Sequence, residues 1–232
     1  MTCPLPTCFS VAFALPLAAA AVTGQFDLSG GKATPTTRGG VVVWLEPVGN
    51  RAPLPPASQH TILQKNKRFS PHISVVPVGT TVDLPNLDPI FHNAFSNFAG
   101  QPFDTGLYPP GGTQKIRFQR EGVVRVFCNI HSRMSAVVVV VGSPWFAVSG
   151  DDGHFSVDGV PPGEYTVKVW HERATEAVLK SLERRVTVPP SGLALPAMVV
   201  NESGYVALPH PNKYGGDYAP EPPSRVPYGK GR

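Results

Sequence analysis

The stretch 127–134, FCNIHSRM, places three potential metal ligands within seven positions. Cys128, His131 and Met134 follow the spacing C-x2-H-x2-M, and His92 lies thirty-six residues before the cysteine, in the stretch NLDPIFHNAFS. A thiolate and a thioether are soft ligands and an imidazole is borderline, so this set favours copper that alternates between two oxidation states. Zinc prefers four strong ligands in a closed tetrahedron, and a methionine in the fourth place argues against it.

The N-terminus has the composition of an export signal. The first twenty residues contain no Asp, Glu, Lys or Arg, the run Val11–Val22 is apolar, and an A-x-A motif stands at Ala18–Ala20. An apolar run this short falls below the roughly 20 residues that a membrane span needs, so the pattern predicts a cleaved signal peptide over 1–21 and a periplasmic or secreted protein. No later segment is long enough to cross a bilayer.

Cleavage would remove Cys3 and Cys8 and leave Cys128 as the only cysteine. Exported proteins usually pair their cysteines, so an unpaired one is either a small buried apolar residue or a group with its own chemistry. The histidine and the methionine at close spacing favour a metal ligand.

Short strands must position these residues. The chain has 23 Gly and 27 Pro but only 16% charged residues, a composition that suits many strands joined by turns. The stretch KIRFQREGVVRVFC alternates apolar and polar residues around a predicted hairpin turn at Glu121–Gly122. AVVVVV (Ala136–Val141) is a continuous apolar run typical of a strand that is covered on both faces or packed inside a sandwich. Almost nothing in 58–142 has helical spacing, so this part is predicted to be an all-β sandwich or barrel.

The strand pattern explains how the ligands could meet. Cys128 follows a predicted strand over Val123–Phe127, and Met134 precedes the apolar run. A short loop between neighbouring strands can curl three ligands around one ion, while His92 arrives from the end of another predicted strand and ties the loop to the body of the fold.

The flanking segments carry a second strand pattern. VTGQFDLSGGKATPTTRGGVVVWLEP (Val22–Pro47) and DDGHFSVDGVPPGEYTVKVWHE (Asp151–Glu172) together resemble a transthyretin-like, carboxypeptidase-regulatory β-sandwich. The resemblance implies that the central β domain is inserted into, or wrapped by, a small sandwich formed by 22–57 and 143–200. The Pro- and Gly-rich part 201–232 is predicted to be a flexible tail or to lie draped over the surface.

Between the strands of the second pattern, TEAVLKSLERR (Thr175–Arg185) fits either one short helix or a strand edge. In the helix, Ala177, Val178 and Leu182 would point inward.

Residues 58–142 resemble a cupredoxin, a blue-copper protein of the plastocyanin and amicyanin kind. The matching features are FSP at Phe69–Pro71, VGTTV at Val78–Val82, HN at His92–Asn93 and CNIHSRM at Cys128–Met134. The resemblance implies a Greek-key β-sandwich with one type-1 copper, whose equatorial ligands are His92, Cys128 and His131 and whose axial ligand is Met134. It also implies that Asn93 forms a hydrogen bond near the cysteine loop and stiffens it.

The same resemblance implies an electron carrier and not an enzyme, with a redox protein such as a cytochrome or a dehydrogenase as its partner. The wider layout is similar to exported proteins of the methylamine-utilisation or plastocyanin-like type. In cupredoxins the loop histidine, here His131, serves as the electron port inside an apolar rim. This chain departs from that rim at Ser132 and Arg133, and the arginine could raise the potential or steer an acidic partner.

Two other functions fit the same ligands: copper handling as a periplasmic chaperone or store, and a structural or interaction module. Scattered Lys and Arg residues, with a formal net charge of +4 and a pI near 9.1, argue against nucleic acid as a partner. No H-x-H pair is present, so the further copper centres of multicopper oxidases are not expected. The oligomeric state leaves no signature in the sequence. The remaining histidines are isolated: His60, His72, His154, His171 and His210.

Overall fold

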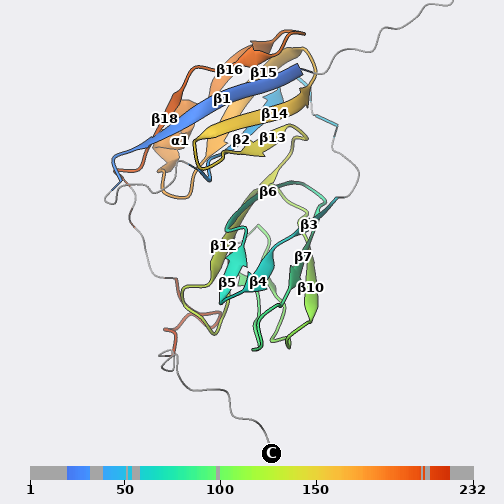
Figure 1. Ribbon diagram of the computed structural model, residues 1–232, viewed down its shortest axis with the longest axis vertical. Helices are drawn as coiled ribbons and strands as arrows, with labels where there is room; N and C mark the ends of the chain where they lie inside the picture. Colours follow the sequence, from blue (N-terminus) through green and yellow to red (C-terminus); the bar gives the residue numbers. More distant parts are fainter. Residues whose placement is uncertain are drawn as a thin grey trace, which may run out of the picture.

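The computed structural model describes residues 20–31, 39–50, 52–53, 58–97, 100–204, 206 and 210–219. Within these ranges the chain forms eighteen strands and one short helix, so the predicted all-β class is confirmed (Figure 1). The predicted signal peptide lies outside the described residues except for Ala20 and Ala21, where the first strand begins, and it stays a prediction.

Strands from both flanks of the chain build one sandwich. One sheet has the order β14-β1-β17 with β18 also beside β1, and the other has the order β13-β2-β15-β16. Buried side chains from both sheets, such as Phe26, Leu45 and Val167, form its core. The strands are β1 Ala20–Ser29, β2 Val42–Pro47, β13 Phe146–Val148, β14 His154–Val160, β15 Gly163–Trp170, β16 Arg184–Val188, β17 Leu193–Ala194 and β18 Met198–Asn201.

The intervening chain builds a second sandwich, drawn in cyan to yellow-green in Figure 1. Its sheets have the orders β10-β7-β3 and β6-β12-β11-β8-β9, and β4 and β5 form a separate hairpin. Between them lies a core that includes Phe69, Val82 and Phe118. The strands are β3 Gln59–Thr61, β4 Leu63–Lys65, β5 Arg68–Ser70, β6 Ile73–Pro77, β7 Thr81–Pro85, β8 Phe95–Ser96, β9 Phe103–Asp104, β10 Thr113–Arg117, β11 Gly122–Phe127 and β12 Ser135–Val141.

The valine run of β12 is buried on both faces, as its unbroken apolar sequence predicts. Successive strand residues point to opposite sides, and Val138 and Val140 accordingly face the core of the central sandwich. Val137, Val139 and Val141 instead pack in a cluster with Val42 and Trp170 of the flanking strands. The strand that closes the ligand loop therefore also joins the two sandwiches.

The predicted hairpin at Glu121–Gly122 is wrong. β10 pairs with β7, whereas β11 pairs with β12 and β8, so the chain crosses from one sheet to the other between them. Phe118, which is 1% exposed, lies at this crossing and donates its backbone N–H to Thr80 O. The alternation of apolar residues predicted the buried face correctly. It does not distinguish two strands paired in one sheet from two strands in facing sheets, because both arrangements turn every second side chain towards the same core.

Of the two alternatives for 175–185, the helix is correct. α1 spans Glu176–Leu182, and the Thr175 side chain caps it by accepting the Val178 N–H. Leu182 is buried and Val178 half-buried, but Ala177 is exposed, because at 3.6 residues per turn it lies on the face of the helix away from those two. No helix in the described part of the chain has the length and apolar character needed to cross a membrane.

A hydrogen-bonded ion pair links the two sandwiches beside β12. His72 Nε2 lies 2.8 Å from Glu172 Oε2, and Arg125 Nη1 lies 3.6 Å from Glu172 Oε1. The hydrogen bond to Glu172 raises the pKa of His72, and the same bond lowers the pKa of Glu172. His72 also contacts the carbonyl of Ser135 at 3.0 Å through Nδ1.

We expect the contribution of this pair to stability to depend on pH. A histidine whose pKa is raised on folding stabilises below its unfolded pKa, and the stabilisation disappears as the pH rises through the raised value. The thermal unfolding midpoint of His72→Gln should therefore fall furthest below that of the parent near about pH 5.5, and the difference should shrink by about pH 8.5, on the two sides of an ordinary histidine pKa of about 6.5. His154→Gln, an exposed histidine in the flanking sandwich, is the control. A difference independent of pH would mean that the ion pair does not contribute.

Candidate metal centre

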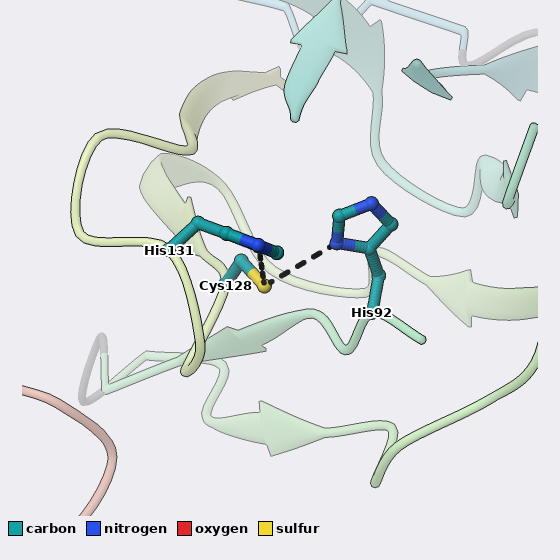
Figure 2. Close-up of side chains that lie close together, drawn as sticks. All are labelled: His92, Cys128 and His131. Atoms are coloured by element: carbon teal, nitrogen blue, oxygen red, sulfur yellow. Dashed lines mark hydrogen bonds between the residues drawn. The ribbon is translucent and has the colours of Figure 1, made fainter. Parts of the chain in front are cut away.

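His92, Cys128 and His131 lie close together in the central sandwich (Figure 2). The Cys128 Sγ lies 3.8 Å from His92 Nδ1 and 3.7 Å from His131 Nδ1. The three ligand atoms lie within 4.8 Å of one another, and all three residues are buried. The two rings approach the sulfur from different sides, so the three donors face a common point (Figure 2).

The pairing of β11 with β12 brings the loop ligands together. Phe127 lies opposite Ser135 in the antiparallel register, so residues 128–134 form the connection between the two strands. Inside it, Cys128 N donates to Met134 O at 3.0 Å and Met134 N donates to His131 O at 3.0 Å. Met134 is 0% exposed and belongs to the same core cluster as the cysteine.

His92 reaches the site from an isolated bridge with Tyr108, not from the end of a strand as the sequence predicts. It precedes the two-residue strand β8, which pairs with β11 through Phe95 and Phe127. Pairing across this sheet brings the distant histidine to the cysteine loop.

Asn93 joins the two parts of the site, as the cupredoxin resemblance implies. Its side-chain Oδ1 accepts the backbone N–H of Asn129 at 2.7 Å, one residue after the cysteine. Its Nδ2 donates to Asp104 Oδ1 at 3.4 Å. Asn93, which follows His92, therefore holds Asn129, which follows Cys128.

Asp88 orients His92 and was not found by sequence reasoning. Its Oδ2 lies 2.8 Å from His92 Nε2, and the carboxylate also accepts the backbone N–H groups of Asn66 at 2.6 Å and Lys67 at 2.8 Å. Because a carboxylate only accepts, Nε2 donates the hydrogen bond to Asp88, and the other ring nitrogen, Nδ1, points towards Cys128. The available signal was an acidic residue four positions before a predicted ligand, but the supporting hairpin turn is visible only in the fold.

The turn that holds Asp88 has an uncommon backbone. Asn66 and Lys67 join β4 to β5 with φ of 56° at both positions, the left-handed region that a two-residue type I′ hairpin turn requires. Asparagine tolerates this region, but a lysine there is uncommon. The two N–H groups of this turn are the ones that bind the Asp88 carboxylate, so the strained turn positions the group that orients His92.

The donors fit a bound metal ion in spacing and in protonation. Metal–ligand bonds of about 2.0–2.3 Å at an angle of about 120° place a nitrogen and a sulfur about 3.8 Å apart, close to the two distances found here. Burial opposes ionisation of Cys128, but hydrogen bonds from His131 and His92 and from the backbone outweigh it and lower the pKa of the thiol to about 5. The thiolate that a metal requires is therefore the stable form at neutral pH.

Part of the predicted flexible tail is held against the ligand loop. The His210 ring stacks on Phe127 with ring centres 3.8 Å apart and contacts Ser132 O at 2.9 Å through Nε2. Tyr218 Oη donates to Cys128 O at 3.0 Å, and Lys213 N donates to Asn129 Oδ1 at 2.8 Å.

A salt bridge of 2.7 Å between Lys213 Nζ and Asp104 adds to these contacts. For 210–219 these contacts correspond to the second of the two alternatives, a segment that lies on the surface, because one histidine, one lysine and one tyrosine find partners that composition does not reveal.

Among solved structures, the chain is similar to several copper proteins. A purple cupredoxin from Nitrosopumilus maritimus is 29% identical, and the match covers 36% of this chain and 99% of that one with a TM-score of 0.32. A mutant of amicyanin in its Cu(I) form is 16% identical, over 43% and 98% of the two chains, with a TM-score of 0.34. No protein-family model and no curated protein matches the chain.

A copper-containing nitrite reductase from Thermus scotoductus is 28% identical over 40% of this chain, with a TM-score of 0.34. The match covers only 24% of that enzyme. Each of these three likenesses therefore concerns less than half of the present chain.

We expect Asp88→Asn to weaken metal binding without unfolding the protein. The amide keeps the size of the side chain but removes the charge that fixes the His92 tautomer, and loss of such a partner costs about 10- to 100-fold in metal affinity. Competition with a chelator of known affinity measures the change. Asp152→Asn, an exposed carboxyl on a turn of the flanking sandwich, is the control for loss of one charge. Equal affinity of the Asp88 variant and the parent would contradict the orienting role.

Proposed function

We propose that this chain is an exported type-1 copper protein of the cupredoxin kind, which carries single electrons between redox proteins and is not an enzyme. The observation that carries the proposal is the convergence of His92 Nδ1, Cys128 Sγ and His131 Nδ1, all within 4.8 Å of one another. Buried Met134 ends the same loop and is the proposed axial ligand. The proposed copper domain is 58–142, flanked by 22–57 and 143–200.

The chemistry of the donors supports copper over zinc. Two imidazoles, one thiolate and a weak thioether form the set that type-1 copper sites use, whereas structural zinc sites take four strong nitrogen or sulfur ligands. Copper bound by these residues supplies a reversible one-electron couple. No described carboxylate completes the cluster of His92, Cys128 and His131 as a fourth strong ligand.

The surroundings of the ligands support electron transfer over catalysis. Asp88 holds the ring of His92, Asn93 holds the cysteine loop and two backbone hydrogen bonds close that loop on itself. Ligands fixed in this way change position little when the charge on the site changes, which keeps the reorganisation energy of electron transfer low. His92 and Cys128 are fully buried and His131 is 6% exposed, whereas a catalytic metal keeps an open position for substrate.

The deciding experiment is the visible and EPR spectrum of the purified chain, from about Val22, after addition of an equivalent of Cu(II). We expect an intense thiolate-to-copper charge-transfer band and a narrow copper hyperfine splitting. Cys128→Ser should abolish the band and keep the fold, as circular dichroism would show, because serine preserves the size of the side chain but not the sulfur. Ser135→Ala, outside the predicted ligand set, is the control. A colourless copper complex in the parent, or a band that persists in the cysteine variant, would contradict the assignment and favour copper handling.

Met134→Leu should keep copper and raise the reduction potential. Removal of a weak thioether donor destabilises Cu(II) more than Cu(I), so reduction of the site becomes more favourable. Leucine has a similar volume and is apolar, which suits a side chain buried in the core. Voltammetry of the parent and the variant measures the shift, with Met198→Leu in the flanking sandwich as the matched control. An unchanged potential would mean that Met134 is not the axial ligand.

A further inference from the structure

A groove of about 1000 Å³ lies between the β4–β5 hairpin and the ligand loop. The hairpin lines one side with residues that include Lys65 and Arg68, and the loop lines the other with His131 and Arg133. Of the three clustered donors only His131 lines this groove, and it alone keeps an exposed fraction, 6% against 0% for the other two. An electron that enters or leaves through His131 would therefore pass into the groove.

The groove is strongly cationic. Four exposed side chains line it, Lys65, Lys67, Arg68 and Arg133, and the described residues of its lining include no Asp or Glu. Within the part of the chain that the structure describes, none of these four forms a salt bridge. The formal net charge of the whole chain is +4, so four cations gathered in one groove make the surface charge uneven. Their combined field attracts anions towards the His131 edge of the site.

Two carboxylates lie near the groove, and both are already engaged. Asp88 lies beneath the hairpin turn, where it accepts two backbone N–H groups and contacts His92. Glu172 bonds to His72 on the groove wall and pairs with Arg125. Among the described residues, neither carboxylate forms a salt bridge with the four cationic side chains, so these side chains remain able to pair with an external partner.

Apolar side chains accompany these charges. Leu63, 37% exposed, lines the groove, and Ile130, also 37% exposed, directly precedes His131. A site for a small anion has a few donors that converge in a pocket, whereas these cations are exposed and spread over two elements. Charges distributed around a few apolar contacts are typical of a protein–protein docking surface.

We propose that this groove docks the acidic surface of a protein redox partner and that one electron passes between the two proteins through the His131 ring. The reduced partner loses one electron and the metal centre gains it, with no bond made or broken, or the reverse. The inference rests on the proposed function and adds the location and the charge of the partner. Attraction between the surfaces would accelerate their encounter at low salt and be screened at high salt.

The charge reversal Lys65→Glu with Arg68→Glu tests the groove. These residues face each other across the hairpin, and neither is a predicted ligand or a neighbour of one. The matched control is Arg117→Glu with Arg120→Glu, two exposed cations at the end of β10 and just after it that do not line the groove. Both pairs change the formal charge equally, and β10 and β5 lie on opposite sides of the central sandwich (Figure 1). Arg133 is left unchanged because its charge, one residue from Met134, would also act on the potential.

Stopped-flow reduction of the copper-loaded protein by a reduced acidic c-type cytochrome gives the first measurement. At low ionic strength the groove variant should react about tenfold or more slowly than the parent, and the control variant should change by no more than about threefold. The difference should largely disappear at high salt, and a basic c-type cytochrome should react faster with the groove variant. Equal losses in both variants would overturn the proposal, because net charge and not the groove would then set the rate.

NMR of the metal-free protein gives a second measurement that does not depend on copper. Titration with the same acidic cytochrome should shift the amide signals of 63–70 and 131–135 in the parent and not in the groove variant. Shifts confined to other regions would overturn the docking site. If hexacyanoferrate(II) loses rate with the groove variant while the acidic cytochrome does not, the groove is a small-anion site and the protein partner is excluded. Absence of a reversible copper couple would overturn the proposed function, while the NMR titration would still decide the groove.

Discussion

The antiparallel register of β11 and β12 is the constraint on which the candidate metal centre depends. With Phe127 opposite Ser135, the connection between the strands has only seven residues, and the backbone hydrogen bonds between Cys128 and Met134 close it. A shift of one residue would change the length of this connection, and it would bring the hydroxyl of Ser135 to the core position of Ala136, because side chains alternate along a strand. The valines that follow pack on both faces of β12 and anchor the strand in the two cores. The polar loop is thus fixed at the end of a firmly packed strand.

The β4–β5 hairpin serves the site from two directions. Its turn, with Asn66 and Lys67 in the left-handed region, presents two N–H groups inward to the carboxylate that orients His92. Its strands present Lys65 and Arg68 outward into the groove beside His131. A buried carboxylate is stable only when donors satisfy it, and here two backbone groups and an imidazole do so. The same few residues thereby connect the orientation of a ligand with the charge of the adjacent surface.

The flanking sandwich and the tail constrain the central sandwich from outside. Val42 and Trp170 cover the outer valines of β12, and the His72–Glu172 pair lies beside this contact. From another part of the chain, Tyr218 and His210 contact the ligand loop and the strand that precedes it. These contacts limit the ways in which the loop can move, which suits the proposed transfer of single electrons.

The sequence alone determined the local features of this protein. Alternation and the unbroken valine run indicate strands and a doubly buried β12, and the spacing C-x2-H-x2-M identifies the loop on which three candidate ligands lie. Only the tertiary structure decided that β10 and β11 belong to different sheets, that Asp88 supports His92, that residues of the tail contact the loop and that four cations share one groove. Periodicity and spacing describe neighbours along the chain. Strand pairing, by contrast, brings together residues far apart in sequence, and which of them meet depends on the free energy of the whole core and not on any short stretch.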